Sequence, residues 1–171
     1  DFAIVQWVML AFVLTQATLM LVMGRLGDTF GKKPIFLSGL VIATVGATLC
    51  GLAPSLEWLI ALRVVQAVGV AMAMALSFGI VAEAFPPNER GMALGTIGGI
   101  VSLGIVIGPI VGGVLLDVLS WRWLFFLNLP FALVSLPIGI RTIPHNRQGS
   151  GGPFDYVGSG IFFISLLAFL L

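Results

Sequence analysis

Long apolar runs without formal charge constrain this chain more than any other feature. A bilayer hydrocarbon core about 30 Å thick is crossed by a helix of roughly 20 apolar residues. Backbone N–H and C=O groups inside lipid must be paired within the protein, so such runs are expected to be helical. Four runs lack charge and a fifth contains only Arg63: residues 2–24, 34–56, 58–82, 91–116 and 123–140. We therefore predict an all-α fold, a polytopic membrane helix bundle with five full spans.

The composition excludes several functional classes. Apolar residues make up 59% of the 171 residues and charged residues 9%, whereas soluble domains have about 45–50% and about 25%. The net charge of +1 gives no case for nucleic-acid binding. No catalytic triad, metal-ligand spacing or phosphate loop is recognisable, so we expect no enzyme. Cys50 is the single cysteine, which excludes an internal disulfide, and we expect it to be a small buried side chain.

The chain divides at a polar stretch near its end. We assign residues 1–143 to the five spans of an N-terminal bundle and residues 144–155 to a cytoplasmic connection. Residues 156–171 are assigned to the start of a further, truncated span. The chain begins without Met and stops within an apolar run, so we expect both ends to be cuts.

Lysine and arginine are distributed unequally between the two sides. The first, third and fifth connections contain Arg25, Lys32, Lys33, Arg90, Arg141 and Arg147, whereas the second and fourth contain only Arg122. Cytoplasmic loops carry the excess of Lys and Arg. The first span is therefore predicted to run from outside to inside, which suggests that one earlier helix precedes it. Trp58, Trp121 and Trp123 fall at the predicted outer interface, where indoles are favoured.

The first cytoplasmic connection contains a glycine-rich basic turn. Its spacing is Gly24-x-Leu26-x-Asp28-x-x-Gly31-Lys32-Lys33. A basic turn obeying the positive-inside rule would look similar, but the spacing resembles the cytoplasmic signature of the major facilitator superfamily. The resemblance implies a loop that latches two halves of a transporter. Thr29 stands where that family usually has a cation. Glu83, at the inner end of the third span, either pairs with Arg25 or Lys32 as part of this gate or is solvated.

Arg63 is the one cation inside a predicted span. Burying it costs several kcal/mol at the bilayer centre, on the order of 2.5–3.5 by insertion scales, and less where it can reach the outer interface. The string Arg63-x-x-Gln66-Ala67-x-Gly69 resembles the fourth-helix motif of the same superfamily. Arg63 and Gln66 lie one helical turn apart and can face one cavity. The resemblance implies a role for Arg63 in proton coupling, opposite an acid on an earlier helix.

The fourth predicted span contains a glycine and proline string. Gly104, Gly108 and Gly112 recur every four residues, with Pro109 and Gly113 beside them. Small residues at this spacing form a groove for a neighbouring helix, which any membrane bundle can use. The whole string resembles the fifth-helix signature of major facilitator antiporters. The resemblance implies a hinge that controls bending and proton leak.

Further strings resemble the 14-helix drug:proton antiporters. They are Gln6-Trp7-Val8, Phe85-Pro-Pro-Asn-Glu-Arg90, Trp121-Arg-Trp-x-Phe125-x-x-Asn128-x-Pro130 and Phe154-Asp-Tyr-x-Gly158. The resemblance implies the N-terminal half of a major facilitator fold, from the second helix to the start of the seventh. It further implies a multi-pass transporter of the plasma or inner membrane that exports hydrophobic or cationic small molecules in exchange for protons.

Two alternatives remain open from the sequence. The same fold could export a metabolite, sugar or siderophore, or the chain could belong to a non-transporting membrane scaffold or sensor. The antiporter hypothesis needs no cofactor beyond the proton gradient, and its partners are a small-molecule substrate and the lipid membrane. An adaptor protein as a further partner stays undetermined.

Overall fold

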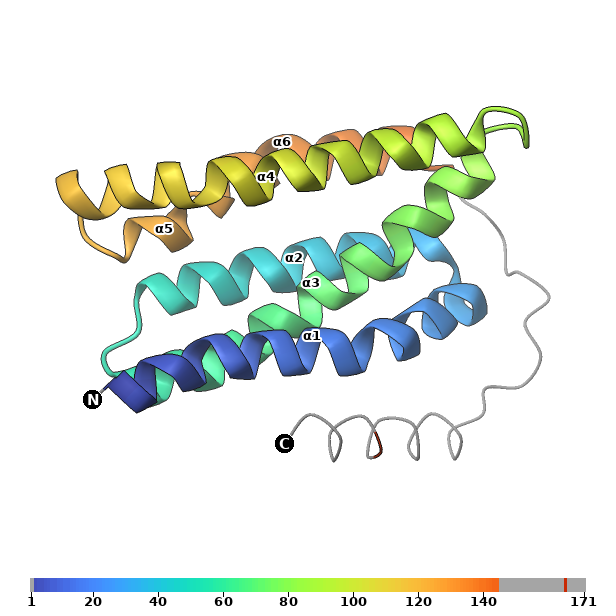
Figure 1. Cartoon of the computed structure of the whole chain (residues 1–171). Helices are drawn as coiled ribbons and strands as arrows, with labels where there is room; N and C mark the ends of the chain where they lie inside the picture. Colours follow the sequence, from blue (N-terminus) through green and yellow to red (C-terminus); the bar gives the residue numbers. More distant parts are fainter. Residues whose placement is uncertain (1, 145–164, 166–171) are drawn as a thin grey trace.

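The computed structural model describes residues 2–144 and residue 165. Its helices are α1 (Phe2–Phe30), α2 (Lys32–Gly51), α3 (Leu56–Ala84), α4 (Arg90–Val118), α5 (Trp123–Phe126) and α6 (Asn128–Thr142) (Figure 1). The described residues contain no strand, which confirms the all-α prediction. Within these residues, five segments are long and apolar enough to cross a membrane, and the fifth of them, Trp123–Thr142, combines α5 and α6.

The first connection is much shorter than the predicted turn over residues 25–33. Helix α1 continues through Arg25 and Asp28 to Phe30, and only Gly31 separates it from α2. Gly31 has φ 97° and is the only positive-φ residue in the described chain. A side chain at this φ would clash with the backbone, so glycine allows an abrupt reversal here. Pro34 lies in the first turn of α2, where its missing N–H costs nothing.

The fifth span is divided into two helical segments at Leu127, which itself keeps helical dihedrals of φ −58° and ψ −26°, whereas the sequence predicts one helix over residues 123–140. Helix α5 ends at Phe126 and α6 begins at Asn128. Pro130 has no N–H to donate to the carbonyl of Phe126, and its ring crowds that same carbonyl. The proline therefore accounts for the break, and it leaves α5 as a single turn at the outer end of the span.

Helix α3 packs along both α1 and α2 and forms the centre of the bundle (Figure 1). Glycines permit its close approach to α2: a Cβ atom added at Gly69 would lie 2.2 Å from the Ala43 nitrogen, and one at Gly39 would lie 2.6 Å from the Met72 Cβ. Cys50 is fully buried in this region, as the sequence predicted. Small residues dominate this crossing, as expected where helix packing in lipid depends on close backbone contact.

Helix α4 is placed differently. It approaches α3 and α5 closely, but among the described helices it has no close approach to α1, α2 or α6. None of its residues is buried. One side of α4 is therefore open within the part of the chain that the structure describes.

The predicted connection over residues 144–155 and the further span over residues 156–171 lie outside the described residues, apart from Pro144 and Ser165. The division of the chain at residue 143 stays a prediction.

Candidate functional site

The Arg63 side chain points into the bundle rather than out to the lipid headgroups. Its guanidinium carbon lies 5.2 Å from the ring centroid of Phe12 on α1 and 4.7 Å from that of Phe125 on α5. Helix α3 presents Arg63 two turns inside its outer end, where α1 and α5 flank it. The cation is thus surrounded by aromatic rings from two other elements.

Gln66 holds one edge of the guanidinium. Its Oε1 accepts a hydrogen bond from Arg63 Nη1 at 3.2 Å, and the Cys50 thiol approaches the same oxygen at 3.9 Å. Gln66 is only 6% exposed, and Gly46 of α2 packs directly against its backbone. The predicted Arg63–Gln66 pairing on one helix turn is therefore present, with Gln66 fixed by α2.

The Arg63 Nε is buried and has no hydrogen-bond partner among the described residues. A buried charged group with an unpaired donor is costly, because the donor loses its bond to water and gains no replacement. The guanidinium therefore has capacity for one more acceptor, such as a carboxylate, a backbone carbonyl or water.

A second cluster lies at the predicted cytoplasmic end. Lys32 forms ion pairs with Asp28 of α1, at 3.5 Å, and with Glu83 of α3. Glu83 is thus paired with Lys32, one of the two cations that the sequence offered. Gly24 lies on α1 one turn before Asp28, and Gly31 makes the break between α1 and α2. The residues of the predicted gate therefore gather around the α1–α2 junction.

Lys33 has a separate role that the sequence did not predict. Its Nζ donates hydrogen bonds to the carbonyl oxygens of Ile140, at 2.7 Å, and Ile143, at 2.6 Å. These carbonyls lie at the carboxyl end of α6, where helix acceptors lack intrahelical partners and a cation is favoured. Lys33 therefore ties the start of α2 to the end of α6.

The glycine and proline string on α4 lies apart from both clusters. A Cβ atom added at Gly104, Gly108 or Gly113 would meet nothing within 4 Å, and one at Gly112 would touch only the Leu124 side chain, at 3.8 Å. The helix continues unbroken through Pro109. Within the described chain this string meets another helix only at Gly112, beside Leu124 of α5, so its predicted hinge role stays a prediction.

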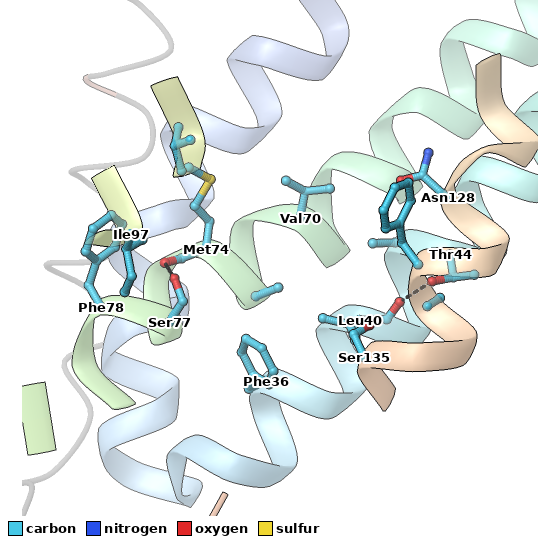
Figure 2. Close-up of a pocket in the computed structure, with 15 residues that line it drawn as sticks. Phe36, Leu40, Thr44, Val70, Met74, Ser77, Phe78, Ile97, Asn128 and Ser135 are labelled. Carbon is cyan, nitrogen blue, oxygen red and sulfur yellow. Dashed lines mark hydrogen bonds between the residues drawn. The ribbon is translucent and has the colours of Figure 1, made fainter. Parts of the chain in front are cut away.

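A pocket of about 370 Å³ opens between α2, α3, α4 and α6 (Figure 2). Phe36 and Phe78 lie near its inner end, while Asn128 and Ser135 reach it from α6. The hydroxyls of Thr44 and Ser77 donate to carbonyls of their own helices. The walls are consequently apolar, with few free polar groups. The predicted site residues do not line this pocket. The one sequence signal that could have pointed to it is the phenylalanine content of 13, since Phe36, Phe78 and Phe131 line its walls.

Comparison with known proteins decides the family. The sequence profile of the Major Facilitator Superfamily matches residues 1–170. The chain belongs to the major facilitator superfamily. This confirms the resemblance that its motifs predicted, and it makes the chain a multi-pass membrane protein of a transporter family rather than an enzyme.

Relatives within the superfamily differ in their named cargo. The chain is 39% identical over 140 residues to the riboflavin transporter RibZ of Clostridioides difficile, covering 82% of this chain and 31% of that protein. It is 36% identical over 168 residues to a multidrug resistance protein B homolog of Mycobacterium tuberculosis, covering 98% of this chain and 31% of that protein. It is 30% identical over 164 residues to multidrug resistance protein 3 of Bacillus subtilis, covering 96% of this chain and 32% of that protein. The chain thus spans less than a third of the length of these superfamily members.

Proposed function

We propose that this chain is part of a 14-helix drug:proton antiporter that exports hydrophobic or cationic small molecules across the plasma membrane. The observation that carries the proposal is Arg63, a cation inside the bundle with one edge on Gln66 and its Nε unpaired. Ionisable residues within membrane spans are costly and mark ion or substrate pathways by default. The named relatives include two multidrug resistance proteins, which favours drugs as cargo.

Arg63 acts in this proposal as the cation of a proton-coupling site. An acid on another helix of the longer protein accepts from its free edge when ionised and releases it when protonated. Gln66 keeps the guanidinium oriented throughout, because α2 packs against its backbone and leaves the residue only 6% exposed. The motif on α4 provides the hinge, and other helices of the longer protein cover its open face and the adjoining pocket.

The cytoplasmic cluster is the gate in this scheme. Lys32 joins α1 to α3 through Asp28 and Glu83. Exposed ion pairs of this kind are worth little individually, which suits contacts that must break and re-form. Transporters rock their two repeats around a central site, and this cluster lies where such a movement would open the inner side.

Replacing Arg63 tests the proposal directly. In the full-length transporter, Arg63→Gln should reduce proton-driven drug efflux to background, because no cation remains to respond to the acid. Substrate-for-substrate exchange without a proton gradient should persist. Efflux from energised vesicles and exchange in de-energised vesicles measure the two activities. Arg141→Gln, which removes an exposed arginine at the inner surface, is the matched control and should keep both. Normal proton-driven efflux in Arg63→Gln would refute the coupling role.

Metabolite export is the second candidate, favoured by the 39% identity to a riboflavin transporter. The discriminating measurement is cargo profiling of the full-length protein in cells. Protection against several dyes and quaternary amines supports drug export. Transport of one polar metabolite with no such protection would favour the second candidate, whereas no transport of any compound would favour a scaffold or sensor.

A further inference from the structure

Arg122 at the predicted outer end is connected to Arg63 by a series of ring contacts. The Arg122 guanidinium lies 4.6 Å from the centroid of the Trp121 ring. Trp121 meets Phe125 edge-on, with centroids 6.0 Å apart and an interplanar angle of 87°. Phe125 then lies 4.7 Å from Arg63, which in turn lies 5.2 Å from Phe12. The tryptophan-rich string after α4 is therefore connected to the partly buried Arg63 and does more than anchor the outer interface.

Aromatic rings can stabilise a guanidinium where water is absent. A cation within about 6 Å of a ring centroid is attracted by the ring quadrupole, and the attraction grows when the pair is desolvated. An arginine near a helix end would otherwise extend toward the headgroups to regain water. Two ring contacts from separate elements oppose that movement and hold the charge inside the bundle.

Phe125 is itself firmly held. It is only 7% exposed and packs in a buried cluster with Val8, Cys50, Ala53 and Leu59. The Trp121 edge lies against its ring, and the single turn of α5 sets its position. A ring fixed in this way can define where the guanidinium sits, whereas a mobile surface ring could not.

We infer that Phe12 and Phe125 form an aromatic clamp that positions Arg63 for coupling, with Phe125 as the dominant member. This inference rests on the proposed function, since it assigns positioning residues to the same site. Phe125 touches neither proton nor cargo. It acts through Arg63, by keeping the guanidinium beside Gln66 and inside the bundle.

The chain offers a matched control for Phe125. Phe126, its neighbour on α5, meets Trp123 edge-on at 5.9 Å and packs against Gly51. In the full-length transporter, Phe125→Leu should lower proton-driven efflux about tenfold, a change that one desolvated cation–π contact can account for. Phe125→Tyr keeps the ring and should retain efflux. Phe126→Leu removes a ring of the same size from the same helix turn and should also retain it.

A second readout separates positioning from folding. In protein with ¹⁵N-labelled arginine, the Arg63 Nε–H resonance, identified by its absence in Arg63→Gln, should be shifted upfield by the ring currents of the clamp. Phe125→Leu should move that resonance toward the ordinary arginine position, while Phe125→Tyr and Phe126→Leu leave it in place.

The two readouts also keep the clamp distinct from the proposed function. An unchanged Arg63 resonance in Phe125→Leu, or an efflux loss no greater than in Phe126→Leu, would overturn the clamp and leave proton coupling standing. Proton-driven efflux that survives Arg63→Gln would instead refute the coupling role. The Arg63 Nε–H resonance alone would then decide whether the two rings position the guanidinium.

Discussion

The two adjacent lysines at the start of α2 perform different tasks. Lys32 forms ion pairs with carboxylates that are about half exposed, at 51% for Asp28 and 46% for Glu83. Solvent screens such pairs, so each contributes about 0–1 kcal/mol. Lys33 instead donates to two carbonyls at the end of α6. Those carbonyls have no hydrogen-bond partner within the helix. Losing their bonds to Lys33 should therefore cost more stability than losing an exposed ion pair.

Substitution of the two lysines should separate these tasks. We expect Lys33→Met to lower the free energy of unfolding by about 1.5–3 kcal/mol, the usual range for hydrogen bonds to a charged group. Lys32→Met should cost less than about 1 kcal/mol. Lys33→Arg, which keeps a cationic donor, should recover most of the loss. Thermal unfolding of the full-length protein in detergent measures the order, and equal midpoints for the two methionine variants would contradict it.

Residue-level prediction from sequence succeeded where the partners are close along the chain. Arg63 and Gln66 are one helical turn apart, and helix geometry alone brings them together. Lys33 and the carbonyls of α6 are 107 and 110 positions apart, and Phe125 reaches Arg63 from another element. No local period encodes such pairs, because they depend on how whole helices are placed.

At the scale of elements, glycines on different helices have opposite environments. Gly39 and Gly69 lie at the crossing of α2 and α3, where an added Cβ would collide with backbone. Gly104 and Gly108 lie on the open face of α4, where an added Cβ would meet nothing within 4 Å. A stripe of small residues predicts that a helix has a face for close contact. Such a stripe does not identify the helix that packs against it. For that reason the α4 string was singled out from the sequence, and the crossing of α2 and α3 was missed.

Valine substitutions should distinguish these two kinds of glycine. Gly69→Val places atoms 2.2 Å from the Ala43 nitrogen, so we expect destabilisation at or above the upper end of overpacking, about 3 kcal/mol. The folded yield should fall sharply. Gly108→Val should fold in normal yield but lose transport if the α4 face moves against another helix during the cycle. Size-exclusion chromatography and efflux assays report the two quantities. Poor folding of Gly108→Val, or normal turnover, would argue against a hinge at this position.

At the scale of the whole molecule, the distribution of charge orients the bundle. Lys32, Lys33, Arg90 and Arg141 all lie at one set of helix ends, and Arg122 lies at the other with Trp58, Trp121 and Trp123. Hydropathy was sufficient to predict the five spans, because the thickness of the bilayer sets the length of an apolar helix. The charge bias predicts which connections lie on the cytoplasmic side. The boundaries at Gly31 and Leu127 were missed, because hydropathy and charge do not register the single residues that set them, Gly31 and Pro130.

Cysteine labelling from either side tests the resulting orientation. Glu57 is exposed at the start of α3 on the predicted outer side, and Glu89 is exposed before α4 on the predicted cytoplasmic side. A membrane-impermeant maleimide applied to intact cells should label Glu57→Cys but not Glu89→Cys, and both after permeabilisation. Cys50 is fully buried and should remain unlabelled, so it serves as the internal control once other accessible cysteines of the full-length protein are replaced. Labelling of Glu89→Cys in intact cells would invert the topology. Arg63 would then lie near the cytoplasmic surface and the Lys32 cluster outside, which is incompatible with the proposed gate.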